Sequence, residues 1–135
     1  MSEQSAPPPR TPGAKRAGAG EYLFDLAKVN KIKGGPDYSS VEGGCVEGDR
    51  MIVALMRMPA GTGAEPHSHP NEQWIYILEG TFKGKVGDKE FEAKPGSVLY
   101  VPANAIHSGK ATPEADVVFF TVKDASHSLH GLKAA

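Results

Sequence analysis

GTGAEPHSHPNEQWIYILEG, residues 61–80, is the stretch of this sequence that says most about the fold. His67 and His69 are two residues apart, so in an extended chain both imidazoles project to the same face, as two ligands of one metal ion must. Gln73 follows a short loop, begins the next strand and can add an amide oxygen. The stretch therefore predicts β-structure that holds a metal site.

The strand that begins at Gln73 is apolar on both of its faces. Ile75 and Ile77 point to the same side as Gln73, whereas Trp74 and Tyr76 point to the opposite side. A second apolar face is generally covered by another element or by another subunit. We therefore expect a homodimer with Trp74 and Tyr76 at or near its interface. The alternative is that an N-terminal strand of the same chain covers them.

From residue 21 onward, short apolar runs alternate with Gly, Pro, Asn and Asp, and no stretch keeps a helical period over three turns. A helix is possible only over residues 26–32 and is not needed. Gly87-Asp88 reads as a tight hairpin. The pattern predicts an all-β sandwich or barrel, and the metal site favours a double-sheet jelly roll. The candidate strands are 22–26, 51–58, 73–78, 81–86, 90–93, 98–101 and 116–122.

A second informative segment is PGSVLYVPANAIHSGK, residues 95–110, in which a strand ends at Pro102 and a loop returns His107 to the structure. Three histidines and one oxygen ligand suit one divalent transition-metal ion (Fe, Mn, Zn, Ni or Cu), with positions left for water or substrate. The remaining histidines, His127 and His130, lie near the C-terminus. They could add a ligand or cover the barrel mouth, but a plain tail is preferred.

These two segments resemble the two motifs of the cupin superfamily, in particular its small single-domain members. The first motif reads Gly61, five residues, His67-Ser68-His69, three residues, Gln73, six residues, Gly80. The second reads Gly96, five residues, Pro102-Ala103-Asn104, two residues, His107, three residues, Ala111. The resemblance covers about residues 50–123. It implies a double-stranded β-helix, or jelly-roll β-barrel, with one metal ion on His67, His69, Gln73 and His107.

Gln73 is the main departure from the family pattern, which has glutamate there. Glutamine is neutral and has no useful basicity, so a divalent ion would keep its whole charge and act as a stronger Lewis acid. Glu72 is the alternative ligand, but Gln73 is preferred because the parity of Glu72 is opposite to that of Gln73 and its distance to Gly80 is one residue too long. Asn104 in place of Gly and Ala111 in place of Asn are minor.

Three functions follow from this reading. In the first, the metal polarises a carbonyl or hydroxyl of a small hydroxy-acid-like or sugar-like metabolite for isomerisation, elimination or hydration. Cupins that linearise unsaturated uronates carry a similar His, His, Gln, His set, so the resemblance favours this function. The second is a non-haem metal dioxygenase that cleaves a dicarbonyl or enediol. The third is a cupin that binds a metabolite without turnover.

Candidate pocket residues lie on the neighbouring strands. Arg57, and Lys83 or Lys85, could bind a substrate carboxylate, although solvation is the plainer reading. Met58 and Tyr100 could line the pocket, although an aromatic residue or methionine in a β-strand more often belongs simply to the core. The acid or base of the reaction is not identified by the sequence.

Composition restricts the partners and the location of the chain. Its 135 residues suit one domain, and its formal charge of −1 with scattered Lys and Arg gives no nucleic-acid footprint. No apolar run approaches a membrane span and no signal-like segment starts the chain, so we expect a cytoplasmic protein. Cys45 is the only cysteine. We expect a flexible tail at 1–20, a barrel domain at 21–124 and a C-terminal tail at 125–135.

Overall fold

The computed structural model describes residues 8–134, and within them the chain forms strands and no helix. The described part therefore contains no helix that could cross a membrane. The strands are β1 (Lys15–Arg16), β2 (Lys31–Lys33), β3 (Glu42–Glu47), β4 (Met51–Met58), β5 (Gly63–Ser68), β6 (Gln73–Glu79), β7 (Phe82–Val86), β8 (Lys89–Ala93), β9 (Val98–Val101), β10 (His107–Ala111), β11 (Val117–Asp124) and β12 (Leu132–Lys133).

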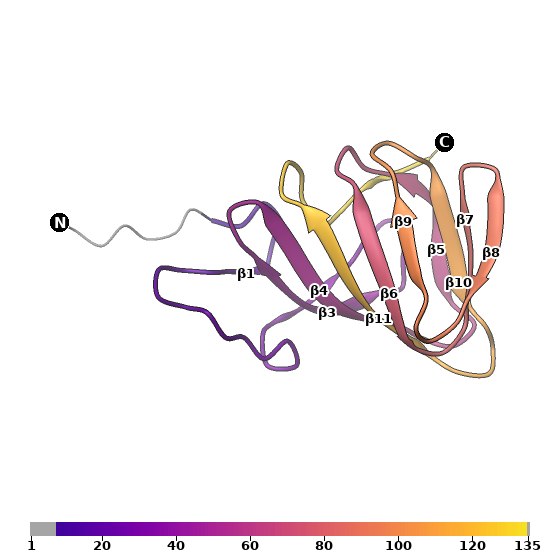
Figure 1. Ribbon diagram of the computed structural model, residues 1–135, viewed down its shortest axis with the longest axis horizontal. Coiled ribbons are helices and arrows are strands. Elements are labelled where there is room, and N and C mark those ends of the chain that lie inside the picture. The colour runs from indigo at the N-terminus through magenta and orange to yellow at the C-terminus, as the bar shows by residue number, and fades with distance from the viewer. Residues whose placement is uncertain (1–7, 135) are drawn as a thin grey trace.

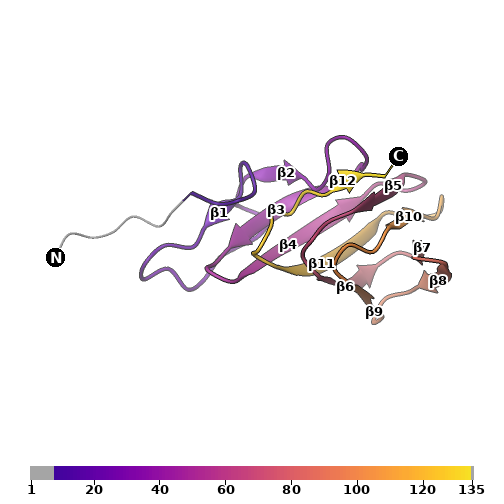
Figure 2. The same cartoon turned by 90° about the horizontal axis from the view of Figure 1, so that it is seen from above.

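The strands form two sheets, as Figures 1 and 2 show. The larger sheet has the order β1-β3-β4-β11-β6-β9, with β2 also paired to β3, and the smaller has the order β12-β5-β10-β7-β8. Neighbours in space are mostly distant in sequence, as in a jelly roll, where the chain passes repeatedly between sheets. The all-β jelly-roll prediction is confirmed.

The hairpin and two of the strands follow the sequence closely. β4 and β9 have the predicted bounds, 51–58 and 98–101. Val86 pairs with Lys89, so Gly87-Asp88 is a two-residue turn, and Gly87 has a positive φ of 59°, which glycine adopts without strain.

The predicted strand at 22–26 is wrong. Tyr22 and Leu23 are 91% and 94% exposed and pair with no strand. Asp25 instead starts a turn, in which its side chain accepts a hydrogen bond from the Ala27 N–H and its carbonyl accepts one from Lys28. The helix considered for residues 26–32 is also absent, because the turn that begins at Asp25 occupies its first residues and β2 occupies its last.

The core lies between the sheets and is built from the inward-facing residues of both. Ile52, Ala54 and Met56 alternate inward on β4 and are buried. On the smaller sheet, Gly84 and Gly109 leave room for the ring of Phe82, because a Cβ at Gly109 would lie 2.1 Å from it. Phe82 can therefore lie flat against β7 and β10 and face the interior.

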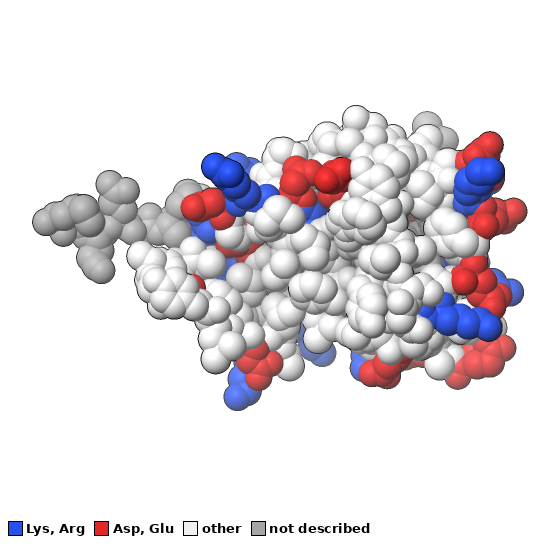
Figure 3. Space-filling view, viewed as in Figure 1, with Lys and Arg blue, Asp and Glu red and all other residues white. Residues whose placement is uncertain are grey.

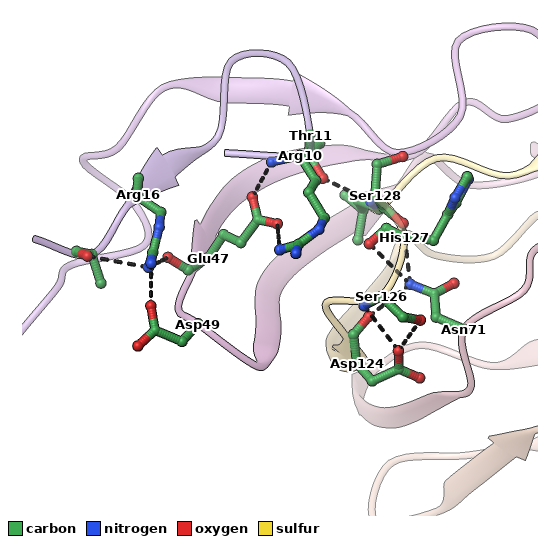
Figure 4. Close-up of polar contacts among 12 residues, drawn as sticks. Arg10, Thr11, Arg16, Glu47, Asp49, Asn71, Asp124, Ser126, His127 and Ser128 are labelled. Carbon is green, nitrogen blue, oxygen red and sulfur yellow. Dashed lines mark hydrogen bonds and ion pairs between the residues drawn. The ribbon is translucent and has the colours of Figure 1, made fainter. Parts of the chain in front are cut away.

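The N-terminal segment packs against the larger sheet, so the predicted tail is wrong for residues 10–17. β1 pairs in parallel with β3, and Thr11 is fully buried. The Arg10 N–H donates to the Glu47 carboxylate at 2.6 Å (Figure 4). The tail was predicted from composition, yet backbone pairing and one buried threonine are enough to hold this segment. Residues 1–7 of the predicted tail lie outside the described part.

The C-terminal segment also belongs to the barrel rather than to a tail. The Asn71 amide donates to the carbonyls of Asp124, His127 and Ser128 and so holds the loop after β11 (Figure 4). Leu129 is buried in the core, and β12 pairs with β5. Buried apolar surface and backbone pairing thus order residues 125–134, which the sequence analysis assigned to a tail.

Candidate metal centre

Three histidines converge at one end of the barrel interior. His67 is on β5, His69 follows it, and His107 opens β10 as the direct cross-strand partner of His67. All three are buried, and their candidate ligand atoms lie within 4.8 Å of one another. Gln73, the first residue of β6, faces them from the larger sheet. The structure therefore brings together all four residues that the sequence selected as metal ligands.

Backbone carbonyls fix the orientation of each imidazole. Every one of the three Nδ1 atoms lies within hydrogen-bond distance of a carbonyl two residues away in the chain: His67 to Glu65 at 2.7 Å, His69 to Asn71 at 2.7 Å and His107 to Ala105 at 2.9 Å. A carbonyl can only accept, so the proton of each neutral ring is on Nδ1. The Nε2 lone pairs are consequently left to face the site, as in metal centres whose ligands are held from outside.

The amide of Gln73 is oriented by Thr121. The Thr121 hydroxyl donates to the carbonyl of Trp74 at 2.8 Å, so its oxygen accepts from the amide nitrogen of Gln73, also at 2.8 Å. This arrangement turns the amide oxygen of Gln73 toward the imidazoles. Gln73 is thereby presented as an oxygen donor to a cation.

The imidazole nitrogens and the amide oxygen that face one another in this site are all hydrogen-bond acceptors. The Nε2 of His69 lies 3.1 Å from the amide oxygen of Gln73 and 3.2 Å from the Nε2 of His107. With the ring protons on Nδ1, these contacts bring lone pairs against lone pairs, which is unfavourable unless a positive charge lies between them. Three imidazole nitrogens and one amide oxygen therefore fit a divalent transition-metal ion.

Burial keeps the three histidines neutral. Desolvation lowers the pKa of His67 to about 3, with the neighbouring His107 as the second cause. Desolvation likewise lowers the pKa values of His69 and His107 to about 4. All three rings are therefore unprotonated at neutral pH and free to bind a metal, since a proton would occupy the same lone pair.

Lys123 is a site residue that the sequence analysis missed. It is the cross-strand partner of Gln73, it is 4% exposed, and its ammonium donates to the carbonyl of Leu129. Burial lowers its pKa to about 7. The predicted strand ended at residue 122, whereas β11 continues to Asp124. Extending the alternation of Val117, Phe119 and Thr121 by one step would have placed Lys123 in the interior.

Tyr38 is the second missed residue; it packs against the ring of His67 and also lines the cavity. Their rings are stacked, with centroids 4.1 Å apart and planes 21° from parallel. The Tyr38 hydroxyl accepts from the Gly131 N–H, and its backbone carbonyl accepts from the N–H of Glu65. Desolvation raises the pKa of Tyr38, so the phenol remains protonated. No periodic pattern surrounds Tyr38 in the sequence, so nothing there marked it.

The centre opens into an interior cavity of about 80 Å³. Its polar wall includes the side chains of Tyr38, Ser39, His67, Gln73, Lys85, His107, Ser108, Thr121 and Lys123. Most of the remaining wall is apolar and includes the side chains of Met56, Met58, Ile75, Ile77, Phe82, Phe91, Leu99 and Phe119. No Asp or Glu of the described residues lines it. The expectation that Met58 lines the pocket therefore agrees with the structure.

Two proposed pocket residues lie elsewhere. Arg57 is exposed on the outer side of β4, where its Nη1 lies 2.9 Å from the carboxylate of Asp116. Tyr100 packs against Trp74 on the outer side of β9, and its hydroxyl donates to Glu72 at 2.6 Å. Strand parity explains both corrections, because each residue is one position away from an inward-facing neighbour. Of the two lysines considered, Lys85 reaches the cavity wall and Lys83 does not.

Comparisons with known proteins agree with this geometry. KdgF from Halomonas sp. superimposes with a TM-score of 0.67 at 17% identity, over 78% of this chain and 94% of that chain. The polyketide cyclase RemF from Streptomyces resistomycificus gives 0.68 at 20% identity, over 78% and 80%. The cupin-2 domain protein Rru_A2000 from Rhodospirillum rubrum gives 0.70 at 15% identity, over 84% and 80%.

No curated protein matches the chain significantly in sequence. At these low identities, the structural similarities establish the fold and nothing more. The sequence pattern of the cupin domain, however, matches residues 54–123, which include all four residues of the metal centre. The chain therefore belongs to the cupin domain family.

Proposed function

We propose that this cupin is a metal-dependent enzyme that acts on a small oxygenated metabolite. The observation that supports the proposal is the ligand set, in which three neutral imidazoles and one neutral amide face a single point. A divalent ion held there would keep its full charge and act as a Lewis acid toward a carbonyl or hydroxyl, which suits isomerisation, elimination or hydration. The ion would be held by His67, His69, Gln73 and His107.

The apolar wall favours such chemistry by excluding water. Met56, Met58 and Phe119 surround the cavity and offer no hydrogen bonds that a competing water could use. Electrostatic interactions are stronger in a dry cavity than in solvent, so a polar group of the substrate would be held firmly by the centre.

Proton transfer would fall to few side chains. With no Asp or Glu of residues 8–134 in the cavity wall, the buried groups that can exchange a proton there besides the histidines are Tyr38 and Lys123, and Lys85 reaches the wall from an exposed position. Tyr38 is protonated and can donate, since burial raises its pKa. Burial lowers the pKa of Lys123 to about 7, within the range useful for an acid or base at neutral pH.

The neutral amide of Gln73 favours Lewis-acid chemistry over a metal-dependent dioxygenase but does not exclude the latter. A carboxylate ligand would partly neutralise the ion and help to stabilise a higher oxidation state, whereas the amide of Gln73 does neither. RemF, one of the structures similar in fold, is a polyketide cyclase, which is consistent with carbonyl chemistry in this scaffold. A dioxygenase and a binding protein without turnover remain the two outcomes against which the proposal is tested.

The test combines metal analysis with turnover under two atmospheres. Protein purified without added metal is analysed for its elements and then incubated with a panel of small oxo and hydroxy acids, under nitrogen and under air. The proposal predicts a bound divalent metal and equal turnover in both atmospheres. Turnover only in air, with oxygen consumed, would identify a dioxygenase. Bound metal with no turnover of any compound would favour the binding protein.

Gln73→Glu is the matched variant for this test. Because it adds a charge at nearly constant volume, we expect it to retain the metal and to lower Lewis-acid turnover. Loss of the metal in this variant would contradict the assignment of Gln73 as a ligand.

A further inference from the structure

The ammonium of Lys123 is a buried charge without a counter-ion. It makes one hydrogen bond, to the carbonyl of Leu129, and two of its three N–H donors have no partner among the described residues. No carboxylate of residues 8–134 lies within ion-pair distance of it. A buried cation is expensive unless it is paired, so an interior lysine with free donors indicates an anion that is supplied from outside the chain.

Glu47, the buried acid of the same sheet, does not supply that anion. In the row of cross-strand partners, Ile52 lies between Glu47 and Lys123. Glu47 accepts a hydrogen bond from the backbone of Arg10 at 2.6 Å, and its other carboxylate oxygen lies 3.8 Å from the Arg10 guanidinium (Figure 4). The negative charge of Glu47 is thus directed toward the N-terminal segment and away from the cavity.

Lys123 is close to the metal centre. It lines the same cavity as His67, Gln73 and His107, and its backbone pairs with that of Gln73. Its positive charge contributes to the lowered pKa of all three histidines, after burial as the main cause. A ligand with one oxygen at the centre could therefore place a second, anionic oxygen at the ammonium of Lys123.

We propose that Lys123 is the anion-binding residue of this cavity and that the substrate is a small organic acid whose carboxylate it binds. The inference rests on the proposed function, because it assumes that the adjacent centre receives another oxygen of the same molecule. Lys123 would select the substrate by its charge. It replaces Arg57, which the sequence suggested for this role and which lies outside the cavity.

The rest of the cavity wall indicates the chemical character of the remainder of the substrate. Met56, Phe82 and Phe119 offer apolar surface, and the cavity of about 80 Å³ is small. A sugar acid carries several hydroxyls, and each would lose its hydrogen bonds with water against such a wall. A short 2-oxo or 2-hydroxy acid with a hydrocarbon tail has the two oxygens at one end and apolar surface at the other. This class fits better than the sugar-like metabolites considered from the sequence.

The test uses one ligand pair and one variant pair. The metal-loaded protein is titrated calorimetrically with 2-oxobutyrate and with butanone, which has the same four-carbon skeleton but no carboxylate. Lys123→Met removes the charge and keeps an unbranched side chain. Lys83→Met removes an exposed charge on β7 that does not line the cavity, and it serves as the control. Metal content and thermal unfolding are measured for every protein, and the titrations are repeated after the metal has been removed.

We expect the unmodified protein to bind 2-oxobutyrate more tightly than butanone, and Lys123→Met to weaken 2-oxobutyrate binding by at least about tenfold. Binding of butanone to Lys123→Met and of either ligand to Lys83→Met should stay within about twofold. Lys123→Met should unfold at the same or a higher temperature, because it removes an unpaired buried charge.

Unchanged binding in Lys123→Met, an equal loss in Lys83→Met, or no preference for the acid in the unmodified protein would each overturn the inference. A lower unfolding temperature with unchanged binding would show instead that Lys123 only holds Leu129. If the unmodified protein holds no metal, the proposed function fails, while the titrations of the metal-free protein still decide the role of Lys123.

Discussion

The two faces of strand β6 have different surroundings. On the inner face, Gln73 and Ile77 are buried at the metal centre and in the core. On the outer face, Trp74, Tyr76 and Leu78 are 45%, 43% and 42% exposed. The inner face is covered by its own chain, whereas the outer face leaves large apolar side chains in water. Because successive side chains of β6 point to opposite faces, one strand contributes both to the metal centre and to an exposed apolar surface.

The outer face of β6 continues onto β9 as a patch. Val98 and Tyr100 are the cross-strand partners of Tyr76 and Trp74, and both are exposed. We call Trp74, Tyr76, Leu78, Val98 and Tyr100 the outer patch. Figure 3, in the same view as Figure 1, shows that the middle of this side of the molecule carries no charged side chain. A patch without charge offers nothing to attract an oppositely charged partner, and a second copy of the same patch matches it.

The largest expected effect is on the inner face. His107→Ala removes one of the three imidazoles, and we expect the metal content of the purified protein to fall from about one ion per chain to nearly none. Elemental analysis measures this directly. Trp74→Ala, a larger truncation on the outer face, is the control and should retain its metal. Equal metal loss in both variants would mean that the two faces are not independent.

The outer patch should control assembly. We propose that the protein is a homodimer with Trp74 near the centre of its interface, and we expect Trp74→Ala to weaken association by about 2 kcal/mol or more. Sedimentation or light scattering over a range of concentrations gives this value. His107→Ala is the control and should dimerise normally. A monomer at micromolar concentration for the unmodified protein would refute the proposal, and strand 22–26 could not be the cover, since that strand does not form.

A smaller effect on metal affinity is expected for Thr121, whose hydroxyl orients the amide of Gln73. Thr121→Val keeps the shape of the side chain but removes the hydroxyl that orients Gln73, so we expect metal affinity to fall by about tenfold. Competition with a chromogenic chelator measures the affinity. Thr62→Val is the control, because the Thr62 hydroxyl donates to the Pro59 carbonyl at an exposed position. An unchanged affinity in Thr121→Val would show that the amide needs no support.

The smallest effect concerns the N-terminal segment, away from both faces of β6. Thr11 is buried and its hydroxyl oxygen accepts from the Leu129 N–H at 2.7 Å. Thr11→Val leaves that donor unpaired, so we expect about 1 kcal/mol less stability and a melting temperature lower by a few degrees. Thermal unfolding monitored by circular dichroism is sufficient to detect this. An unchanged melting temperature would indicate instead that the N-terminal segment is a flexible tail.

The predictable parts of this structure are those in which local pattern and tertiary context agree. β4 and β9 alternate in hydrophobicity and have the predicted bounds, and the spacing of His67, His69 and His107 identified the centre. β3, β5 and β10 were not predicted, because Gly, Pro and His have little strand propensity and the partner strands supply the order.

The remaining errors arose where a single buried group outweighs local composition. The N-terminal segment is rich in Pro, Ala and Gly, yet Thr11 and the pairing of β1 hold it against the barrel. Lys123 and Tyr38 became site residues only through contacts across the fold. Lys123 depends on the exact end of β11, and Tyr38 depends on a loop that folds over His67. Extending the alternation of β11 would have found Lys123, whereas the loop that carries Tyr38 cannot be placed from spacing along the chain.

The central claim, that His67, His69, His107 and Gln73 hold one metal ion, is tested most directly by X-ray absorption at the metal edge of protein purified without added metal. The account predicts about one ion per chain, with the signature of three imidazole rings and with nitrogen or oxygen neighbours at about 2.0–2.2 Å. A His107→Ala sample loaded with the same metal should lose one imidazole contribution or the metal itself. A metal-free protein, or a metal that shows no imidazole signature, would contradict the account.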